Sequence, residues 1–284
     1  MKRILVLIDF SQASHQAALY AAGLTHQLEA DELMLYHSYE FMPPAEVPLP
    51  ELADMERLRL ESLAGLTKLK NELRTYVSER TLIGILTDGR PLLTAATAIA
   101  AEQQTGLTVM GVTGKSKLAQ VLIGSNTLLM AREWAAPLLF VPKEAVYKKI
   151  RRVAFACELE NISAATPADV IRRLIHALNA HLLILNVDTK DRAHFTPDTI
   201  DEQTALHELW DREKPDYHYL INEDIAEGIL QFTREHDIQL MIAVPRHHNF
   251  FDRLFHGSLT QKLAFRTPVP LLLIRENQLP DSSD

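Results

Sequence analysis

The sequence predicts an α/β protein made of two doubly wound, parallel-sheet domains in tandem. Short, fully apolar runs such as residues 4–8 are typical of strands that are buried on both faces. Segments with apolar residues at helical spacing follow these runs, and the whole pattern occurs twice in 284 residues. Alternating strands and helices imply parallel strands joined by right-handed crossovers.

The first half begins with a strand over residues 4–8, which ends at Asp9. A helix is expected over residues 11–28, with Ser11 or Ser14 as its N-cap. Further strands are expected over residues 33–37, 81–86, 107–110 and 138–141, and further helices over residues 51–77, 92–104 and 126–134. A turn over residues 88–91 separates the third strand from the helix that follows it.

The second half repeats this plan. Three pairs of segments match: residues 2–9 with 151–158, 30–36 with 180–186, and 124–141 with 257–274. Internal repetition of this kind is the signature of duplicated structural units. The polar segment 143–149 lies between two strands and marks the boundary. We therefore expect domains at residues 1–146 and 147–279.

Composition argues against nucleic acid and membranes as partners and against an oxidising compartment. The chain has 29 Lys and Arg against 37 Asp and Glu, a formal charge of -8, and no basic block, so nucleic acid is an unexpected partner. The single cysteine, Cys157, allows no intramolecular disulfide and is expected to be a buried thiol. The run of residues 4–8 is too short for a secretory segment or a membrane span. We expect a cytoplasmic, soluble protein with no membrane partner.

The strongest motif follows the expected strand at residues 107–110. Gly111, Gly114 and Gly124-Ser125 form the spacing G-x2-G-x9-G-S. Glycines let backbone amides approach a phosphate, and the amides at the start of the next helix favour an anion. A P-loop would need glycine where Val109 stands, so we reject that interpretation. The pattern predicts a phosphate site at the carboxyl ends of the strands, where open α/β sheets bind ligands.

This pattern resembles the nucleotide-binding signature of the universal stress protein family, and the resemblance covers nearly the whole chain as two domains. It implies that Asp9 faces the ribose or base of adenosine and that Ser38 lines the adenine. The remaining expected contacts are Met110 and Gly111 with the base and ribose, and Gly114, Gly124, Ser125 and Asn126 with the phosphates. The sequence departs from the family pattern at Ser38, usually a small aliphatic residue, and at Gly106, often aspartate.

The motif is complete only in the first half. Val244 stands where Gly111 would be repeated, His247 where Gly114 would be, and Glu158 replaces Asp9. Side chains at the two glycine positions would occupy the space that a phosphate needs. We therefore expect the second domain to bind no ATP and to act as a packing partner.

A histidine-rich segment in the second half is interpreted as a polar loop or an interface rather than a metal site. It contains His247, His248, Asp252 and His256. Adjacent histidines rarely both point into one site, and no cysteine or second carboxylate completes a tetrahedral ligand set.

The resemblance implies a regulatory or stress-response protein that binds ATP, with or without Mg²⁺, in its first domain and lacks efficient catalysis. One alternative is a slow ATPase or a nucleotidyl-transfer enzyme, although no catalytic base is evident beside Ser125. Another is a scaffold whose site is empty or holds an apolar ligand. The expected partners are an adenine nucleotide and an unidentified protein. The last strands of the two domains are expected to pair within one chain as a pseudo-dimer, and a homodimer of whole chains is left open.

Overall fold

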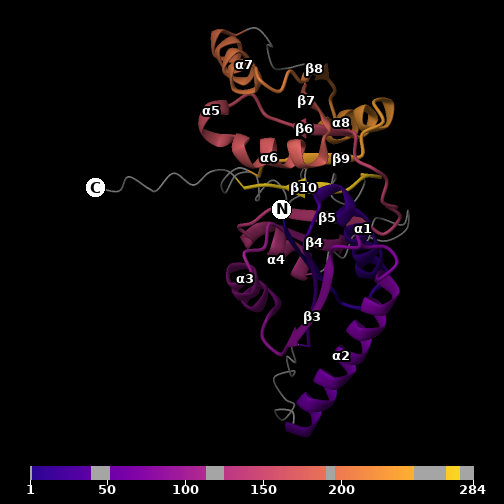
Figure 1. The fold of residues 1–284 in the computed structure, drawn as a ribbon. Helices are drawn as coiled ribbons and strands as arrows, with labels where there is room; N and C mark the ends of the chain where they lie inside the picture. Colours follow the sequence, from indigo (N-terminus) through magenta and orange to yellow (C-terminus); the bar gives the residue numbers. More distant parts are fainter. Residues whose placement is uncertain (1, 40–51, 113–124, 190–195, 246–266, 276–284) are drawn as a thin grey trace, which may run out of the picture. The chain divides into compact units, whose positions relative to one another are not determined.

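The structure is a computed structural model that describes residues 2–39, 52–112, 125–189, 196–245 and 267–275. It separates into two compact units, Met1–Lys148 and Lys149–Asp284, which we call domain 1 and domain 2. Both are parallel sheets with helical crossovers (Figure 1), so the predicted α/β class is confirmed.

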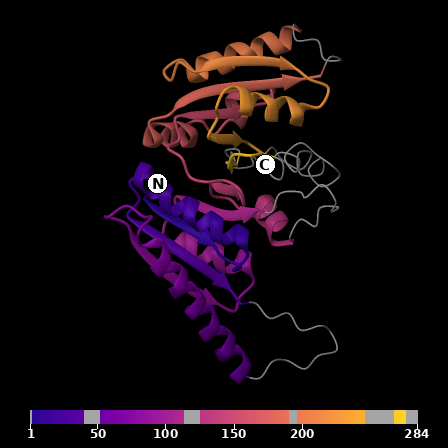
Figure 2. The same ribbon diagram turned by 90° about the vertical axis from the view of Figure 1, so that its right-hand side faces the viewer.

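The described residues of domain 1 form five parallel strands in the order β3-β2-β1-β4-β5. In sequence order its elements are β1 (Arg3–Leu7), α1 (Gln12–Leu28), β2 (Glu32–Ser38), α2 (Leu52–Leu73), β3 (Leu82–Asp88), α3 (Leu92–Glu102), β4 (Leu107–Val112), α4 (Ser125–Glu133) and β5 (Leu138–Pro142). Helices α1 and α2 cover one face of the sheet, and α3 and α4 cover the other (Figure 1). The long helix α2 runs beside the sheet in both views (Figures 1 and 2). The strands expected from apolar runs are therefore covered on both faces.

The core of domain 1 is built from the central strand and the helix that follows it. In β1 and the residue after it, positions 4–8 are all buried. In α1 the side chains of Ala17, Ala18 and Ala21 are fully buried, because their small size lets the helix lie close to β4 and β5. Ser11 is the N-cap of α1, and its hydroxyl accepts a hydrogen bond from the Ser14 backbone N–H.

The segment after β5 lies against α1. The ring of Tyr147 packs where Gly23 has no side chain, since a Cβ there would lie 2.4 Å from Tyr147 Cδ1. The Tyr147 hydroxyl donates a hydrogen bond to Gln27 Oε1 at 3.0 Å, and Gln16 Nε2 donates one to the Ala145 carbonyl at 2.7 Å. This segment, expected from its polar composition to be only a boundary, is thus attached to the first helix of domain 1.

In the part of domain 2 that the structure describes, five parallel strands follow the order β10-β9-β6-β7-β8. Its elements are β6 (Arg152–Ala156), α5 (Ile162–Ala165), α6 (Ala168–Leu178), β7 (His181–Asp188), α7 (Pro197–Trp210), β8 (Asp216–Ile221), α8 (Ile225–Glu235), β9 (Leu240–Ala243) and β10 (Leu271–Leu273). Read from β8 to β10, the strand order is the same as that of domain 1 read from β3 to β5. Its first helix is broken, because Thr166 and Pro167 separate α5 from α6.

Among the helices of the described residues, none combines the length with the apolar composition that a membrane span requires.

Candidate functional site

The carboxyl ends of β2, β1 and β4 meet at one edge of the domain 1 sheet. Leu7 of β1 lies between Tyr36 of β2 and Met110 of β4. The chain leaves β1 through α1 on one face of the sheet and reaches β4 through α3 on the other. Strand β1 therefore borders the topological switch point, the place where open α/β sheets form a ligand crevice.

Asp9 follows β1 at this edge, and its side chain is exposed. Its Oδ1 accepts a hydrogen bond from the Ser11 backbone N–H at 2.9 Å, and its own N–H donates to Ser14 Oγ at 3.3 Å. These bonds form the turn into α1. Partial burial favours the neutral acid, but the hydrogen bonds from Ser11 and Ser14 outweigh it and lower the pKa of Asp9. An ionised carboxylate therefore stands at the crevice near neutral pH.

Phe10 is a further residue of this edge that the sequence analysis did not select. Its backbone is left-handed, with a φ of 59°, which is uncommon for a bulky side chain. Its ring lies 4.5 Å from the ring of His37 and against Gly65 of α2, where a Cβ would be 2.7 Å from Phe10 Cε1. The side chain is still 47% exposed. An aromatic surface is thus held beside Asp9 by two other elements.

His37 and Thr87 tie together the ends of three neighbouring strands. His37 Nδ1 lies 2.7 Å from the carbonyl oxygen of Ile8, so this nitrogen carries the proton and donates it. Thr87 Oγ1 donates a hydrogen bond to the His37 carbonyl at 2.8 Å. The imidazole of His37 is therefore a structural link between β1 and β2.

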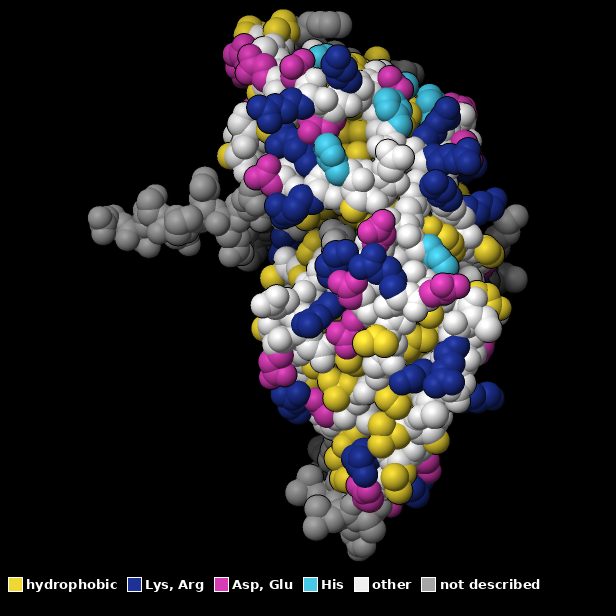
Figure 3. Space-filling model, viewed as in Figure 1, with side chains coloured by type: hydrophobic (Ala, Val, Ile, Leu, Met, Phe, Trp, Pro, Cys, Tyr) yellow, Lys and Arg dark blue, Asp and Glu magenta, His cyan; other side chains and the backbone are white. Residues whose placement is uncertain are grey.

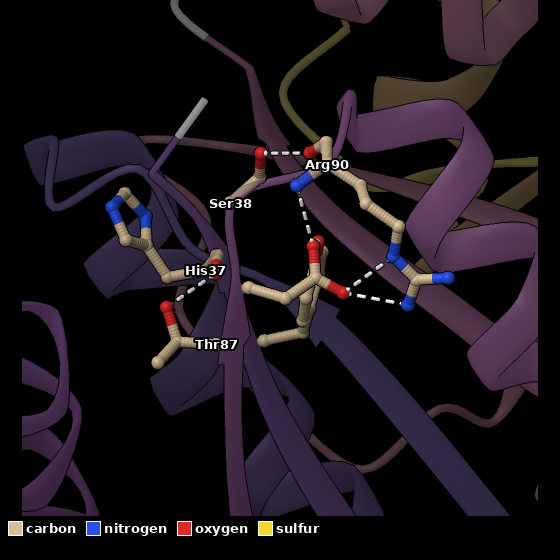
Figure 4. A network of polar contacts seen from close by, with 6 residues as sticks. His37, Ser38, Thr87 and Arg90 are labelled. Atoms are coloured by element: carbon tan, nitrogen blue, oxygen red, sulfur yellow. Dashed lines mark hydrogen bonds and ion pairs between the residues drawn. The ribbon is translucent and has the colours of Figure 1, made fainter. Parts of the chain in front are cut away.

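Ser38 belongs to a polar network at the ends of β2 and β3 (Figure 4). Its hydroxyl donates a hydrogen bond to the Arg90 carbonyl at 2.7 Å. Asp88 accepts bonds from the Arg90 backbone N–H at 2.8 Å and from its Nε at 2.9 Å. Burial opposes ionisation of Asp88, yet the contacts with Arg90 outweigh it and lower the pKa of Asp88. The turn predicted over residues 88–91 is thus cross-linked to Ser38, the residue expected to line the adenine.

Gly111 lies within β4, opposite Val141 of β5. A Cβ at this position would lie 2.2 Å from the carbonyl oxygen of Ala13 and 2.6 Å from the backbone nitrogen of Ser14. Glycine is therefore required for the first turn of α1 to cross β4, whether or not a ligand is bound. Met110, the residue before it, is buried.

The remaining predicted contacts follow β4. Ser125 and Asn126 are the first two residues of α4, and both are exposed. Gly114 and Gly124 lie outside the described residues, as do His247, His248, Asp252 and His256 of the second half. Within the part of the chain that the structure describes, no three His, Cys, Asp or Glu side chains form a group that could hold a metal ion.

A model of the universal stress protein family matches residues 1–142 and 173–275. The chain belongs to the universal stress protein family. The predicted tandem arrangement of two universal stress domains is therefore confirmed. A comparison with curated proteins finds no match.

Two solved structures share the universal stress fold over nearly the whole chain. A universal stress protein from Archaeoglobus fulgidus DSM 4304 is 15% identical, with a TM-score of 0.71, and the match covers 96% of this chain and 98% of that one. A functionally unknown protein from Pseudomonas aeruginosa PAO1 is 13% identical, with a TM-score of 0.59, over 98% of this chain and 93% of that one. At these identities the likeness concerns the fold alone.

The second universal stress domain forms its corresponding edge differently. The Cys157 N–H donates to the Leu185 carbonyl at 2.9 Å, as the Ile8 N–H donates to the Tyr36 carbonyl at 2.8 Å, so the strand ends correspond. The start of α5, however, is bound by a carboxylate of the protein itself. Glu202 of α7 accepts hydrogen bonds from the backbone N–H groups of Asn161 at 2.9 Å and Ile162 at 2.8 Å.

Proposed function

We propose that domain 1 binds an adenine nucleotide, ATP, at the carboxyl ends of β2, β1 and β4, in a regulatory or stress-response role without efficient catalysis. Membership of the universal stress protein family supports a role of this kind. The observation that carries the proposal is the ionised Asp9 beside a half-exposed Phe10 ring at the topological switch point. In this proposal, nucleotide occupancy changes a surface that a protein partner reads.

Each part of the nucleotide has a candidate contact of suitable chemistry. The Asp9 carboxylate can accept hydrogen bonds from ribose hydroxyls, and the Phe10 ring offers a flat apolar surface to a base. The same carboxylate would repel phosphates. We therefore assign the phosphates to Gly114, Gly124, Ser125 and Asn126, because glycine amides and the start of α4 favour an anion. Met110, Gly111 and Ser38 would border the base and ribose.

Calorimetric titration with ATP tests the proposal, together with analysis of the nucleotide released when freshly purified protein is denatured. We expect one ATP per chain. Asp9→Asn keeps the turn but removes the charge, and should weaken binding on the order of 10-fold, because a hydrogen bond to a charged group is worth about 1.5 kcal/mol or more. Glu158→Gln is the matched control in domain 2 and should leave binding unchanged.

Two results would contradict this assignment. Equal affinity of the wild type and Asp9→Asn for ATP would show that Asp9 does not contact the nucleotide. Two equivalent ATP molecules per chain would contradict a site confined to domain 1. The catalytic alternative is tested in the same preparations by measuring ADP production. Turnover well above the uncatalysed rate that is lost in Asp9→Asn would establish an enzyme instead.

A further inference from the structure

Strand β8 ends the strand order of domain 2 and, among the described residues, pairs on one side only, with β7. The Asn222 N–H donates to the Asp188 carbonyl at 2.9 Å, so the backbone of Asn222 faces β7. Backbone groups alternate in direction along a strand. The N–H and C=O groups of Tyr217, Tyr219 and Ile221 therefore face away from β7, at the outer edge of the sheet.

The side chains of the same three residues lie on one face of the sheet, because side chains alternate with period two. Tyr219 is 39% exposed and Ile221 is 55% exposed. His207 of α7 stacks on Tyr217 with ring centroids 3.8 Å apart and lies 3.1 Å from the Tyr219 hydroxyl. The two tyrosine rings are therefore ordered before any partner arrives, which lowers the entropy cost of binding.

We propose that this edge pairs with the same edge of a second copy of the chain, antiparallel, about a two-fold axis at Tyr219. Tyr219 then faces Tyr219 of the other copy, and Tyr217 faces Ile221. Each of these pairs joins outward-facing backbone groups and exchanges two hydrogen bonds, about six in all. The side chains add aromatic–aromatic and aromatic–aliphatic cross-strand contacts. About a two-fold axis, the same residues of both copies form the interface, as in most homodimers.

Charge at the ends of β8 fits this register. Asp216, the first and only acidic residue of β8, comes opposite Asn222 of the other copy, so no like charges face each other in this register. Residues 217–221 contain no lysine, acidic residue or proline, the residues that commonly protect an edge from pairing. The edge can thus pair with itself without a repulsive charge pair.

The outward-facing side chains of β3, the corresponding edge of domain 1, are less exposed. Hydrophobic side chains are visible over β3 and α2 in Figure 3, but α2 packs on β3 and the side chains of Ile83, Ile85 and Thr87 are half-buried. The proposal therefore concerns β8 alone.

Sedimentation equilibrium of the full-length wild type and of two charge variants tests the proposal. We expect a reversible dimer for the wild type. Tyr219→Lys and Tyr219→Glu each place like charges across the two-fold axis and should weaken dimerisation at least 10-fold, whereas an equimolar mixture of the two should restore it as a 1:1 heterodimer. Tyr76→Lys in domain 1, where the tyrosine is 50% exposed, is the matched control and should dimerise like the wild type.

Hydrogen exchange adds a measurement that needs no variant. The amides of Tyr217, Tyr219 and Ile221 should exchange more slowly as the concentration of wild-type protein rises, while exchange at β3 should not change. A monomeric wild type would overturn the proposal. So would a dimer that persists in Tyr219→Lys, or a failure of the mixed variants to associate.

Discussion

The substitution Gly111→Ala adds one methyl group at the point where α1 crosses β4. The new Cβ would lie 2.2 Å from the carbonyl oxygen and 2.3 Å from the carbonyl carbon of Ala13, and 2.6 Å from the Ser14 nitrogen. Ordinary contacts between such atoms are about 3.5 Å. All three neighbours belong to the backbone of the first turn of α1, so a change of rotamer cannot relieve the overlap.

The cost of this overlap has two parts. Overpacking a well-packed site costs about 1–3 kcal/mol. Moving the first turn of α1 also disturbs its N-cap, where the Ser11 hydroxyl accepts from the Ser14 N–H at 3.2 Å, and loss of such a cap costs about 1 kcal/mol. We expect Gly111→Ala to lower the free energy of unfolding of domain 1 by about 2–4 kcal/mol without any nucleotide present.

Urea denaturation followed by tryptophan fluorescence can report on domain 1 alone. The chain has two tryptophans, and a Trp210→Phe background leaves Trp134, which is buried in domain 1. The matched control is Gly84→Ala, whose Cβ would lie 2.5 Å from Met34 Cε, the end of a flexible side chain that can move aside. A Gly111→Ala domain within about 0.5 kcal/mol of its parent, or an equal loss in Gly84→Ala, would refute the packing role.

Two further predictions concern domain 2 and the segment after β5. Burial and the nearby His236 lower the pKa of His218 against the opposing charge of Asp216, so the unfolded chain takes up this proton more readily than the folded one. Domain 2 should lose stability as the pH falls below about 6.5, and His218→Phe should reduce that loss in urea titrations at several pH values. Tyr147→Ala should destabilise domain 1 by about 2 kcal/mol and speed tryptic cleavage after Lys148 and Lys149; unchanged cleavage would mean that Tyr147 does not hold the segment.

The positions of the strands and helices could be predicted because their signals are local. Apolar runs and helical spacing predicted the described elements of domain 1 to within a few residues, and Ser11 is one of the two N-caps expected for α1. The expected helix over 51–77 ends at Leu73, and the strand expected over 107–110 continues to Val112. The intramolecular pairing of the two domains stays a prediction.

The contacts that shape the candidate site could not be predicted in the same way. Phe10 adopts a left-handed backbone that residue type alone disfavours, and its partners His37 and Gly65 come from two other elements. The bond from Ser38 to Arg90 joins positions 52 residues apart. A weak signal for the Tyr147 contact was present, because an isolated glycine inside a helix, here Gly23, often marks a close packing contact.

The packing role of Gly111 changes what the sequence of domain 2 implies. Val244 takes the place of this glycine, and there the first helix is divided into α5 and α6 at Thr166 and Pro167. The two matches to the family leave out residues 143–172, the stretch that contains α5 and the break. A side chain at the position of Gly111 is incompatible with a first helix placed like α1, and domain 2, which has valine there, has an altered first helix.

It follows that Val244 bears on where the first helix of domain 2 can run, and not on whether domain 2 binds a phosphate. The prediction that domain 2 binds no ATP is better supported by His247, which stands in the sequence where the proposed phosphate contact Gly114 would be repeated, and by Glu202, whose carboxylate already accepts hydrogen bonds from the backbone N–H groups of Asn161 and Ile162. Replacing Val244 by glycine alone should consequently leave domain 2 without measurable ATP binding, because the helix break, His247 and the bound carboxylate of Glu202 would all remain.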